Sequence, residues 1–170
     1  MLKRATSAVI WVATLSVALV LSELIPAHAG SRSITAKGLL GQTLMVSPAR
    51  NVSDKQIVTV TGKNFDTKIG IYVAYCEIPQ KGMKPENCFG GINIDGSSKG
   101  SIWISSNAPL YAKFLTRPFG KNGSFKVEVM TSRFIGNTDC KIKRCGVVTR
   151  ADHYRSDFRK ADVLVPITFK

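Results

Sequence analysis

Short stretches in which apolar and polar residues alternate recur along most of the chain. The clearest is Ser124–Met130, where every second residue (Phe125, Val127 and Val129) is apolar. A period of two residues, combined with β-branched and aromatic side chains, is typical of half-buried β-strands. The same pattern predicts further strands at Gln42–Pro48, Gln56–Thr61, Ile69–Ile78, Ser101–Ser105, Cys145–Ala151 and Asp162–Phe169.

No segment has a sustained helical period, although residues 108–116 and 152–162 are compatible with single helical turns. About seven short strands separated by turn signals indicate an antiparallel β-sandwich. Pro166 lies in the last predicted strand and cannot donate a hydrogen bond, so we expect it at a sheet edge or a bulge. Residues 79–100 are rich in glycine and lack a strand pattern, which indicates a long functional loop.

The N-terminus has the three parts of a secretory signal peptide. Lys3 and Arg4 precede an apolar run over residues 8–25, and the small residues around Ala29 provide a cleavage site. We therefore predict residues 1–29 to be a signal peptide that is cleaved after Ala29. The alternative is a retained membrane anchor, because the apolar run approaches the length that spans a bilayer.

The mature chain left by this cleavage would be a single, strongly basic domain. Residues 30–41 are small and polar, which indicates a flexible lead-in, and residues 42–170 would form the sandwich. The full chain carries 24 Lys and Arg against 11 Asp and Glu, a formal charge of +13. Such a charge either attracts anionic partners, such as nucleic acid, wall polymers or lipid, or gives a solvated surface that aids solubility.

Four cysteines fall in the predicted mature chain: Cys76, Cys88, Cys140 and Cys145. An even number in an exported chain indicates two disulfides, and counting alone allows three pairings. Sequence proximity favours Cys76–Cys88 and Cys140–Cys145, each of which would clamp a local loop. A zinc site is the alternative, but the chain has no C-x-x-C pair and the spacing is uneven, so we expect no metal.

The chain lacks the sequence motifs of common catalytic sites. Neither G-x-S-x-G nor S-x-x-K occurs, and no phosphate-binding glycine loop is present. His153 beside Asp152 has the chemistry of a general base or of a metal or haem ligand, but Asp152 capping a turn is the simpler interpretation. We therefore expect a protein that is not an enzyme.

Several landmarks follow one another in order along the chain. They are VSPARNVSDKQIVTVTGKNF (46–65), IYVAYC ending at Cys76 with Cys88 beyond it, G-S-F-x-V (123–127), DCKIKRCGVVTRADH (139–153) and VPITF (165–169). Over residues 42–169 this pattern, and above all the paired cysteine spacings, resembles the neocarzinostatin family of actinobacterial proteins.

The resemblance implies a seven-stranded antiparallel immunoglobulin-like β-sandwich with both local disulfides. It also implies a cleft beside the first disulfide, in which founding members hold a labile enediyne chromophore that cleaves DNA. We therefore expect a secreted, monomeric carrier of an apolar small molecule, with no cofactor beyond such a non-covalently bound chromophore. The expected ligand-cleft residues are Tyr72, Ala74, Ile78, Phe89 and Ile92.

Three positions differ from the family's cleft. This chain has Ile78, Glu86 and Met130 where the family has aromatic or apolar residues. Trp103 and Phe134 are further aromatic residues that would compensate. A shared scaffold does not by itself establish a shared ligand, so the resemblance implies the fold more strongly than the chromophore.

An alternative function rests on the basic residues. If the loop between the last two cysteines lies beside the segment that follows, one basic patch forms from Lys141, Lys143, Arg144, Arg150, Arg155 and Arg159. The protein would then be an envelope or surface interaction module that binds anionic polymers or nucleic acid through this patch.

Overall fold

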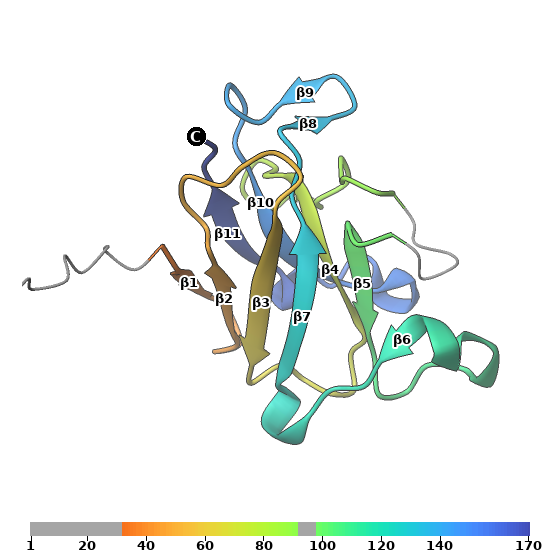
Figure 1. Cartoon of the computed structure of the whole chain (residues 1–170). Coiled ribbons are helices and arrows are strands. Elements are labelled where there is room, and N and C mark those ends of the chain that lie inside the picture. Colours follow the sequence, from red (N-terminus) through yellow and green to blue (C-terminus); the bar gives the residue numbers. More distant parts are fainter. Residues whose placement is uncertain (1–31, 92–97) are drawn as a thin grey trace, which may run out of the picture.

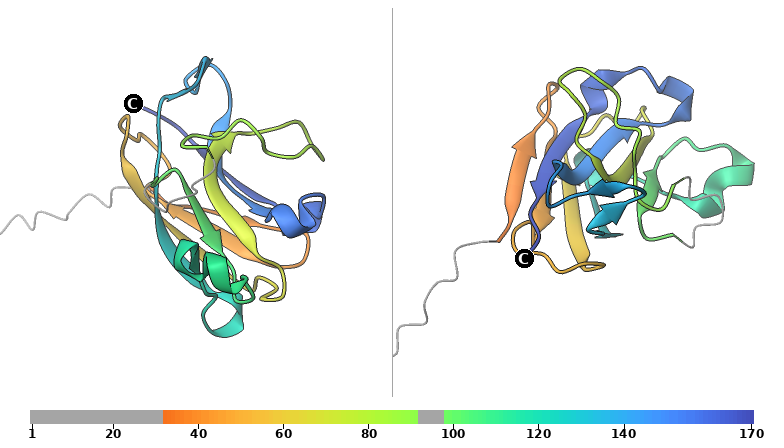
Figure 2. Two further views of the ribbon diagram at one scale, coloured as in Figure 1. Left: turned by 90° about the vertical axis from the view of Figure 1, so that its right-hand side faces the viewer. Right: turned by 90° about the horizontal axis from the view of Figure 1, so that it is seen from above.

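The alternating segments form strands that pack as two sheets, and the computed structural model describes residues 32–91 and 98–170 (Figure 1). The first sheet contains, in spatial order, β1 (Ile34–Lys37), β2 (Thr43–Ser47), β3 (Ile57–Lys63) and β7 (Phe125–Met130). The second contains β11 (Val163–Ile167), β10 (Cys145–Ala151), β4 (Ile71–Glu77), β5 (Ser101–Ile104) and β6 (Thr116–Arg117). The two layers can be followed from two further directions in Figure 2.

The strand pairs in these sheets are antiparallel except for β5 with the short β6, which are parallel. A separate hairpin joins β8 (Phe134–Ile135) to β9 (Thr138–Asp139). Short 3-10 helices lie between strands: η1 (Leu110–Leu115), η2 (Lys121–Gly123), η3 (His153–Arg155) and η4 (Arg159–Ala161). The helical turns predicted within residues 108–116 and 152–162 are thus confirmed.

All of the strands predicted from alternation are present, as β2, β3, β4, β5, β7, β10 and β11. The predicted antiparallel sandwich is therefore confirmed, with β1 and β6 as additions at the sheet edges. Pro166 lies in β11, which pairs only with β10 and forms one edge of its sheet, as expected for a residue without an N–H. Within the described ranges, no helix has the length and apolar character needed to cross a membrane.

One expectation about the N-terminal region is wrong. Residues 30–41 were expected to be a flexible lead-in, but Ile34–Lys37 form β1, which pairs with all of Thr43–Val46 in register. Ile34 and Ala36 pack against the core, so this segment belongs to the sandwich although its own sequence is small and polar. The predicted signal peptide, residues 1–29, lies outside the described residues.

The core lies between the sheets and follows the predicted alternation. In β7, Phe125, Val127 and Val129 are buried, and the intervening lysine and glutamate are exposed. Both predicted disulfides are present, Cys76–Cys88 and Cys140–Cys145, and no cysteine is free. Each of the two bridges closes a local loop, with sequence separations of 12 and 5 residues.

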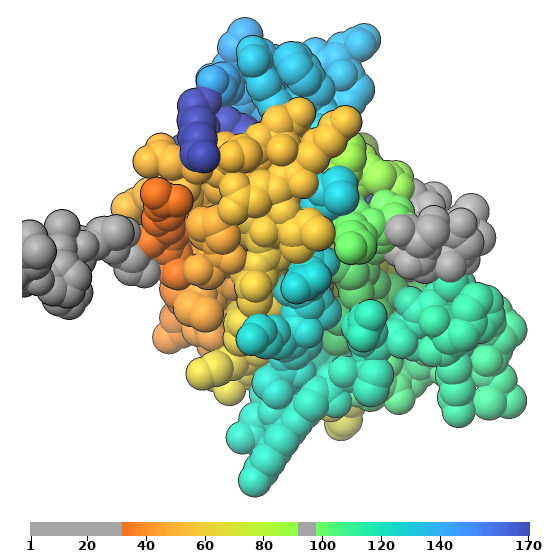
Figure 3. Space-filling model, viewed as in Figure 1, coloured from red at the N-terminus to blue at the C-terminus, as the bar shows by residue number. Residues whose placement is uncertain are grey.

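Two segments extend beyond the sandwich. Figure 3 shows the β8–β9 hairpin at the top of the molecule and the segment with η1 and β6 standing out at the lower right. On η1, Leu110, Tyr111 and Phe114 are between 73% and 81% exposed, so this turn adds little to the core. Its last residue, Leu115, instead lines the cleft described next.

Candidate functional site

The outer face of the second sheet carries two rows of side chains that cross three strands. Register places Arg150 of β10 opposite Tyr72 of β4, and Tyr72 opposite Trp103 of β5. The next row, two residues along, consists of Val148, Ala74 and Ser101. Since successive side chains of a strand point to opposite faces, both rows lie away from the main core.

A cleft of about 390 Å³ lies over these rows. The large side chains of the first row form one wall of the cleft. The smaller side chains of the second row, among them Ala74 and Ser101, form its floor. The residues that line the cleft are Tyr72, Ala74, Glu86, Cys88, Gly91, Ser101, Trp103, Leu115, Arg150 and His153. This volume falls in the range of about 300–1,000 Å³ that is typical of small-molecule sites.

The Cys76–Cys88 disulfide attaches the loop after β4 to the floor of this cleft. Cys76 is fully buried and belongs to a small apolar cluster with Ala74 and Val148. The loop is held a second time where Arg150 donates from Nη1 to the carbonyl oxygen of Pro85, at 2.7 Å. The rim is therefore tied both to β4 and to β10.

The aromatic wall is fixed by hydrogen bonds at its polar atoms. Trp103 donates its indole N–H to Oδ2 of Asp152, at 3.1 Å. The hydroxyl of Tyr72 lies 2.6 Å from Nδ1 of His153. The His153 ring also meets the Trp103 ring edge to face, with centroids 5.0 Å apart. The rings of Tyr72, Trp103 and His153 thus form a preorganised surface for a flat apolar ligand.

Asp152 holds this wall from beneath the surface. Its side chain is buried, and besides the indole it accepts from the backbone N–H of Tyr154 through Oδ1, at 3.2 Å. The prediction that Asp152 caps a turn is therefore confirmed, at the start of η3. Burial, and secondarily the charge of Asp152, raises the pKa of Tyr72 to about 12, so its phenol keeps its proton at neutral pH.

The structure places the predicted cleft residues in different environments. Tyr72 and Ala74 line the cleft. Ile78 does not, because β4 ends at Glu77 and the backbone N–H of Ile78 donates to the carbonyl oxygen of Arg144, in the loop before β10. Phe89 does not either, since it follows Cys88 and packs against the core between the sheets. Ile92 lies outside the described residues.

Sequence reasoning missed two of the groups that shape the cleft. The sequence indicates Trp103 only as an aromatic residue that could compensate, although alternation in β5, with Ile104 buried, places Trp103 on the outer face. The sequence predicts Arg150 in a surface patch, whereas it is partly buried in the cleft with its guanidinium 5.7 Å from the Tyr72 ring centroid.

The expected single basic patch is divided. Lys141, Lys143 and Arg144 are exposed in the loop that precedes β10, while Arg150 and Arg155 lie at and beyond its other end. A seven-residue strand separates the two groups by roughly 20 Å at about 3.3 Å per residue.

The remaining cation of that expected patch is not free. Arg159 is paired with Asp162, with 2.9 Å between Nη1 and Oδ2, and its other terminal nitrogen donates to the carbonyl oxygen of Ser156. The anionic-polymer prediction therefore rests on the loop between Cys140 and Cys145 alone. It stays a prediction.

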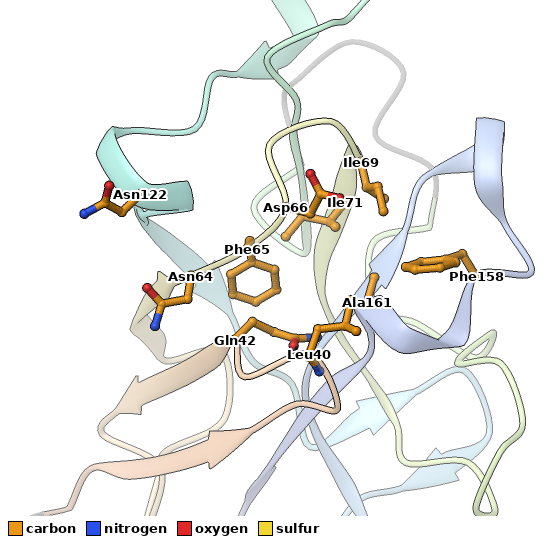
Figure 4. A pocket seen from close by; sticks show the side chains of 10 residues that line it. All are labelled: Leu40, Gln42, Asn64, Phe65, Asp66, Ile69, Ile71, Asn122, Phe158 and Ala161. Carbon is orange, nitrogen blue, oxygen red and sulfur yellow. Dashed lines mark hydrogen bonds between the residues drawn. The ribbon is translucent and has the colours of Figure 1, made fainter.

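A second cavity of about 340 Å³ lies elsewhere, between connections at one end of the sandwich. Figure 4 shows Gln42 and Phe65 at its middle, with Asn64 and Asn122 on one side and Phe158 on the other. Gln42 is buried, and its amide is satisfied by the backbone N–H of Leu40 and the carbonyl oxygen of Lys160. The oxygen and the nitrogen of the Gln42 amide thus each already have a partner within the protein.

No group of three or more His, Cys, Asp or Glu side chains suited to a metal ion occurs in the part of the chain that the structure describes. His153 is instead engaged with Tyr72 and with its aromatic neighbours.

Comparison with known proteins identifies the architecture. The solved structure of macromomycin matches 76% of this chain and 99% of its own length, with a TM-score of 0.50. The sequences are 16% identical, so the likeness concerns the fold alone. Macromomycin is an apoprotein of the neocarzinostatin family, and the predicted resemblance in fold is thereby confirmed. No family model matches the chain, and neither does any curated protein.

Proposed function

We propose that this protein is an exported, non-enzymatic carrier that holds a small aromatic molecule in the cleft over β10, β4 and β5. The observation that carries the proposal is the combination of a cleft of about 390 Å³ with a preset wall of Tyr72, Trp103 and His153. Binding sites for small molecules are largely preformed, mostly apolar and concave, with few polar groups. The macromomycin-like fold supports the same role.

Export is supported by the covalent structure. Both disulfides would persist in an oxidising compartment, and the N-terminal sequence has the pattern of a signal peptide cleaved after Ala29. The retained anchor is the alternative. An intact-mass measurement on protein from its own host distinguishes the two, because a cleaved chain begins at Gly30.

Trp103 makes the cleft directly observable. The sequence has two tryptophans, Trp11 in the predicted signal peptide and Trp103 in the cleft wall, so the Trp11→Phe variant has a single tryptophan, at the site. Anthracenemethanol is a flat neutral probe that absorbs where tryptophan emits. We expect it to quench Trp103 saturably, with one molecule bound per chain in equilibrium dialysis.

A filled cleft should lose this binding. Ala74→Leu adds bulk to the low row of the floor, whereas Thr59→Leu adds a similar side chain on the outer face of the other sheet. We expect weak or absent quenching for Ala74→Leu and wild-type quenching for Thr59→Leu. Absence of saturable binding by the unfilled protein, or equal binding by both variants, would contradict the proposal.

A further inference from the structure

The polar atoms of the aromatic wall are already occupied by the protein. The Trp103 indole N–H donates to Asp152, and the Tyr72 hydroxyl is engaged with His153. Asp152 itself is not among the residues that line the cleft. The wall therefore offers a ligand mainly ring faces and apolar contact.

Arg150 differs from these wall residues, because it lines the cleft and has N–H donors that are not used within the described part of the protein. A guanidinium has five N–H donors. One of its terminal nitrogens donates to Pro85, and no salt bridge between described residues includes Arg150. Its guanidinium also lies over the Tyr72 ring, which holds it beside the aromatic wall. A partly buried cation with free donors favours an anionic partner.

The carboxylate on the rim does not cancel this preference. Glu86 lines the cleft, but its carboxylate is bound by Lys84 at 2.9 Å and its side chain is 69% exposed. Charges in contact with water are screened, whereas those in a partly buried cleft act more strongly. The cleft thus presents a cation beside its aromatic wall and an already paired anion at its edge.

We infer that the ligand is an aromatic anion, in which a flat ring system lies against Trp103 and Tyr72 and a carboxylate or similar acidic group binds Arg150. The inference rests on the proposed function and deepens it by naming the ligand's chemical class. Bidentate binding of a planar carboxylate is the geometry for which the guanidinium fork is suited.

Three probes that share one ring system and carry substituents of different charge test the inference. Anthracenecarboxylate is anionic, anthracenemethanol is neutral and aminomethylanthracene is cationic, each with its substituent on the central ring. Each is titrated into the full-length Trp11→Phe protein, and quenching of Trp103 gives the affinity. We expect the carboxylate to bind roughly ten- to hundredfold more tightly than the alcohol, and the amine least tightly.

Two variants locate the origin of this preference. In Arg150→Gln the carboxylate should bind no more tightly than the alcohol, while Arg150→Lys should keep a reduced preference because it keeps the charge and loses the fork. Arg155→Gln is the matched control. Arg155 also donates to a backbone carbonyl, that of Lys68, at 2.7 Å, but it does not line this cleft. It should retain the wild-type preference.

The outcomes separate the two proposals. If no probe binds saturably, the proposed function fails and the inference fails with it. If the alcohol binds but the carboxylate binds no better, the cleft is a carrier site and only the inference is overturned. A preference for the carboxylate that survives intact in Arg150→Gln also overturns it, because the selectivity then arises elsewhere. A purely structural role of Arg150 in holding Pro85 would lower the affinity for all three probes equally, and this too contradicts the inference.

Discussion

The indole N–H of Trp103 is hydrogen bonded to a buried carboxylate, Oδ2 of Asp152, although the two residues are 49 positions apart in the sequence. The same carboxylate caps η3, which carries His153 and Tyr154. One buried side chain therefore fixes both the ring on β5 and the turn after β10. The orientation of the aromatic wall depends on this contact.

Replacing Asp152 by alanine should destabilise the protein and loosen the wall. The variant leaves the Trp103 N–H without this acceptor and removes the cap from Tyr154, so we expect a loss of about 1–3 kcal/mol in the free energy of unfolding. Urea denaturation measures the loss. In the Trp11→Phe background, emission from Trp103 should shift to longer wavelength as the indole gains water.

The control for this variant is Asp157→Ala, which removes an exposed carboxylate from the same segment. It should change neither the urea midpoint nor the emission of Trp103. Wild-type stability and emission in Asp152→Ala would mean that the hydrogen bond does not hold the wall.

Gly70 is required by the same carboxylate. A Cβ at this position would overlap Oδ2 of Asp152 and come within 3.1 Å of the Ser105 hydroxyl. Gly70→Ala should therefore cost about 1–3 kcal/mol in the free energy of unfolding, as overpacked sites do. In a double-mutant cycle with Asp152→Ala the cost of Gly70→Ala should fall, because the overlapping carboxylate is gone. Additive costs in the double variant would show that the overlap is not the cause.

The strands of this fold were predictable because burial imposes a period of two on the sequence. In β4 the alternation assigns Ile71, Val73 and Tyr75 to the core, which leaves Tyr72 and Ala74 on the other face. That information is local, and it suffices to place side chains on one face or the other of a strand.

The composition of the site was less predictable because it depends on pairing between distant segments. Arg150 meets Tyr72 through the register of β10 against β4, and no local pattern reports that register. Phe89 illustrates the same limit for a loop. Backbone pairing of Cys88 with Cys76 directs the next residue, Phe89, toward the core. The loop sequence has no period of two from which the direction of this side chain could be predicted. Likewise, β1 forms by pairing with β2 and not from its own composition.

The two disulfides should have different effects on ligand binding. Cys76 and Cys88 belong to the apolar cluster under the cleft, whereas Cys140 and Cys145 are buried in the main core on the other face of the sheet. Replacing the first pair by alanine should lower stability by about 3 kcal/mol and weaken binding of anthracenemethanol, because the rim loses its covalent tie.

The second pair provides the matched control. Its alanine variant opens a shorter loop and should lower stability by about 2 kcal/mol, with unchanged affinity when measured below the unfolding transition. Equal losses of affinity in both variants would argue that binding follows global stability and not the tie at the rim.

Stability in acid should depend on the ion pair that precedes the second disulfide. Arg133 donates from Nη2 to Oδ2 of Asp139, at 2.7 Å, and from Nε to Oδ1, at 3.1 Å, while the backbone N–H of Lys141 also donates to Oδ1. These hydrogen bonds, foremost those from Arg133, lower the pKa of Asp139 from 3.8 to about 2. The folded state therefore binds this proton less tightly than the unfolded state does.

It follows that Asp139 stabilises the fold above about pH 4 and that this contribution is lost as the pH falls toward about 2. We expect Asp139→Asn to be less stable than wild type at neutral pH and to converge with it near pH 2, as measured by urea denaturation across this range. Asp157→Asn, which removes an exposed carboxylate without an ion pair among the described residues, should give a curve parallel to wild type. If the deficit of Asp139→Asn stayed constant down to the lowest pH, its cause would be the lost hydrogen-bond geometry and not the charge of the carboxylate.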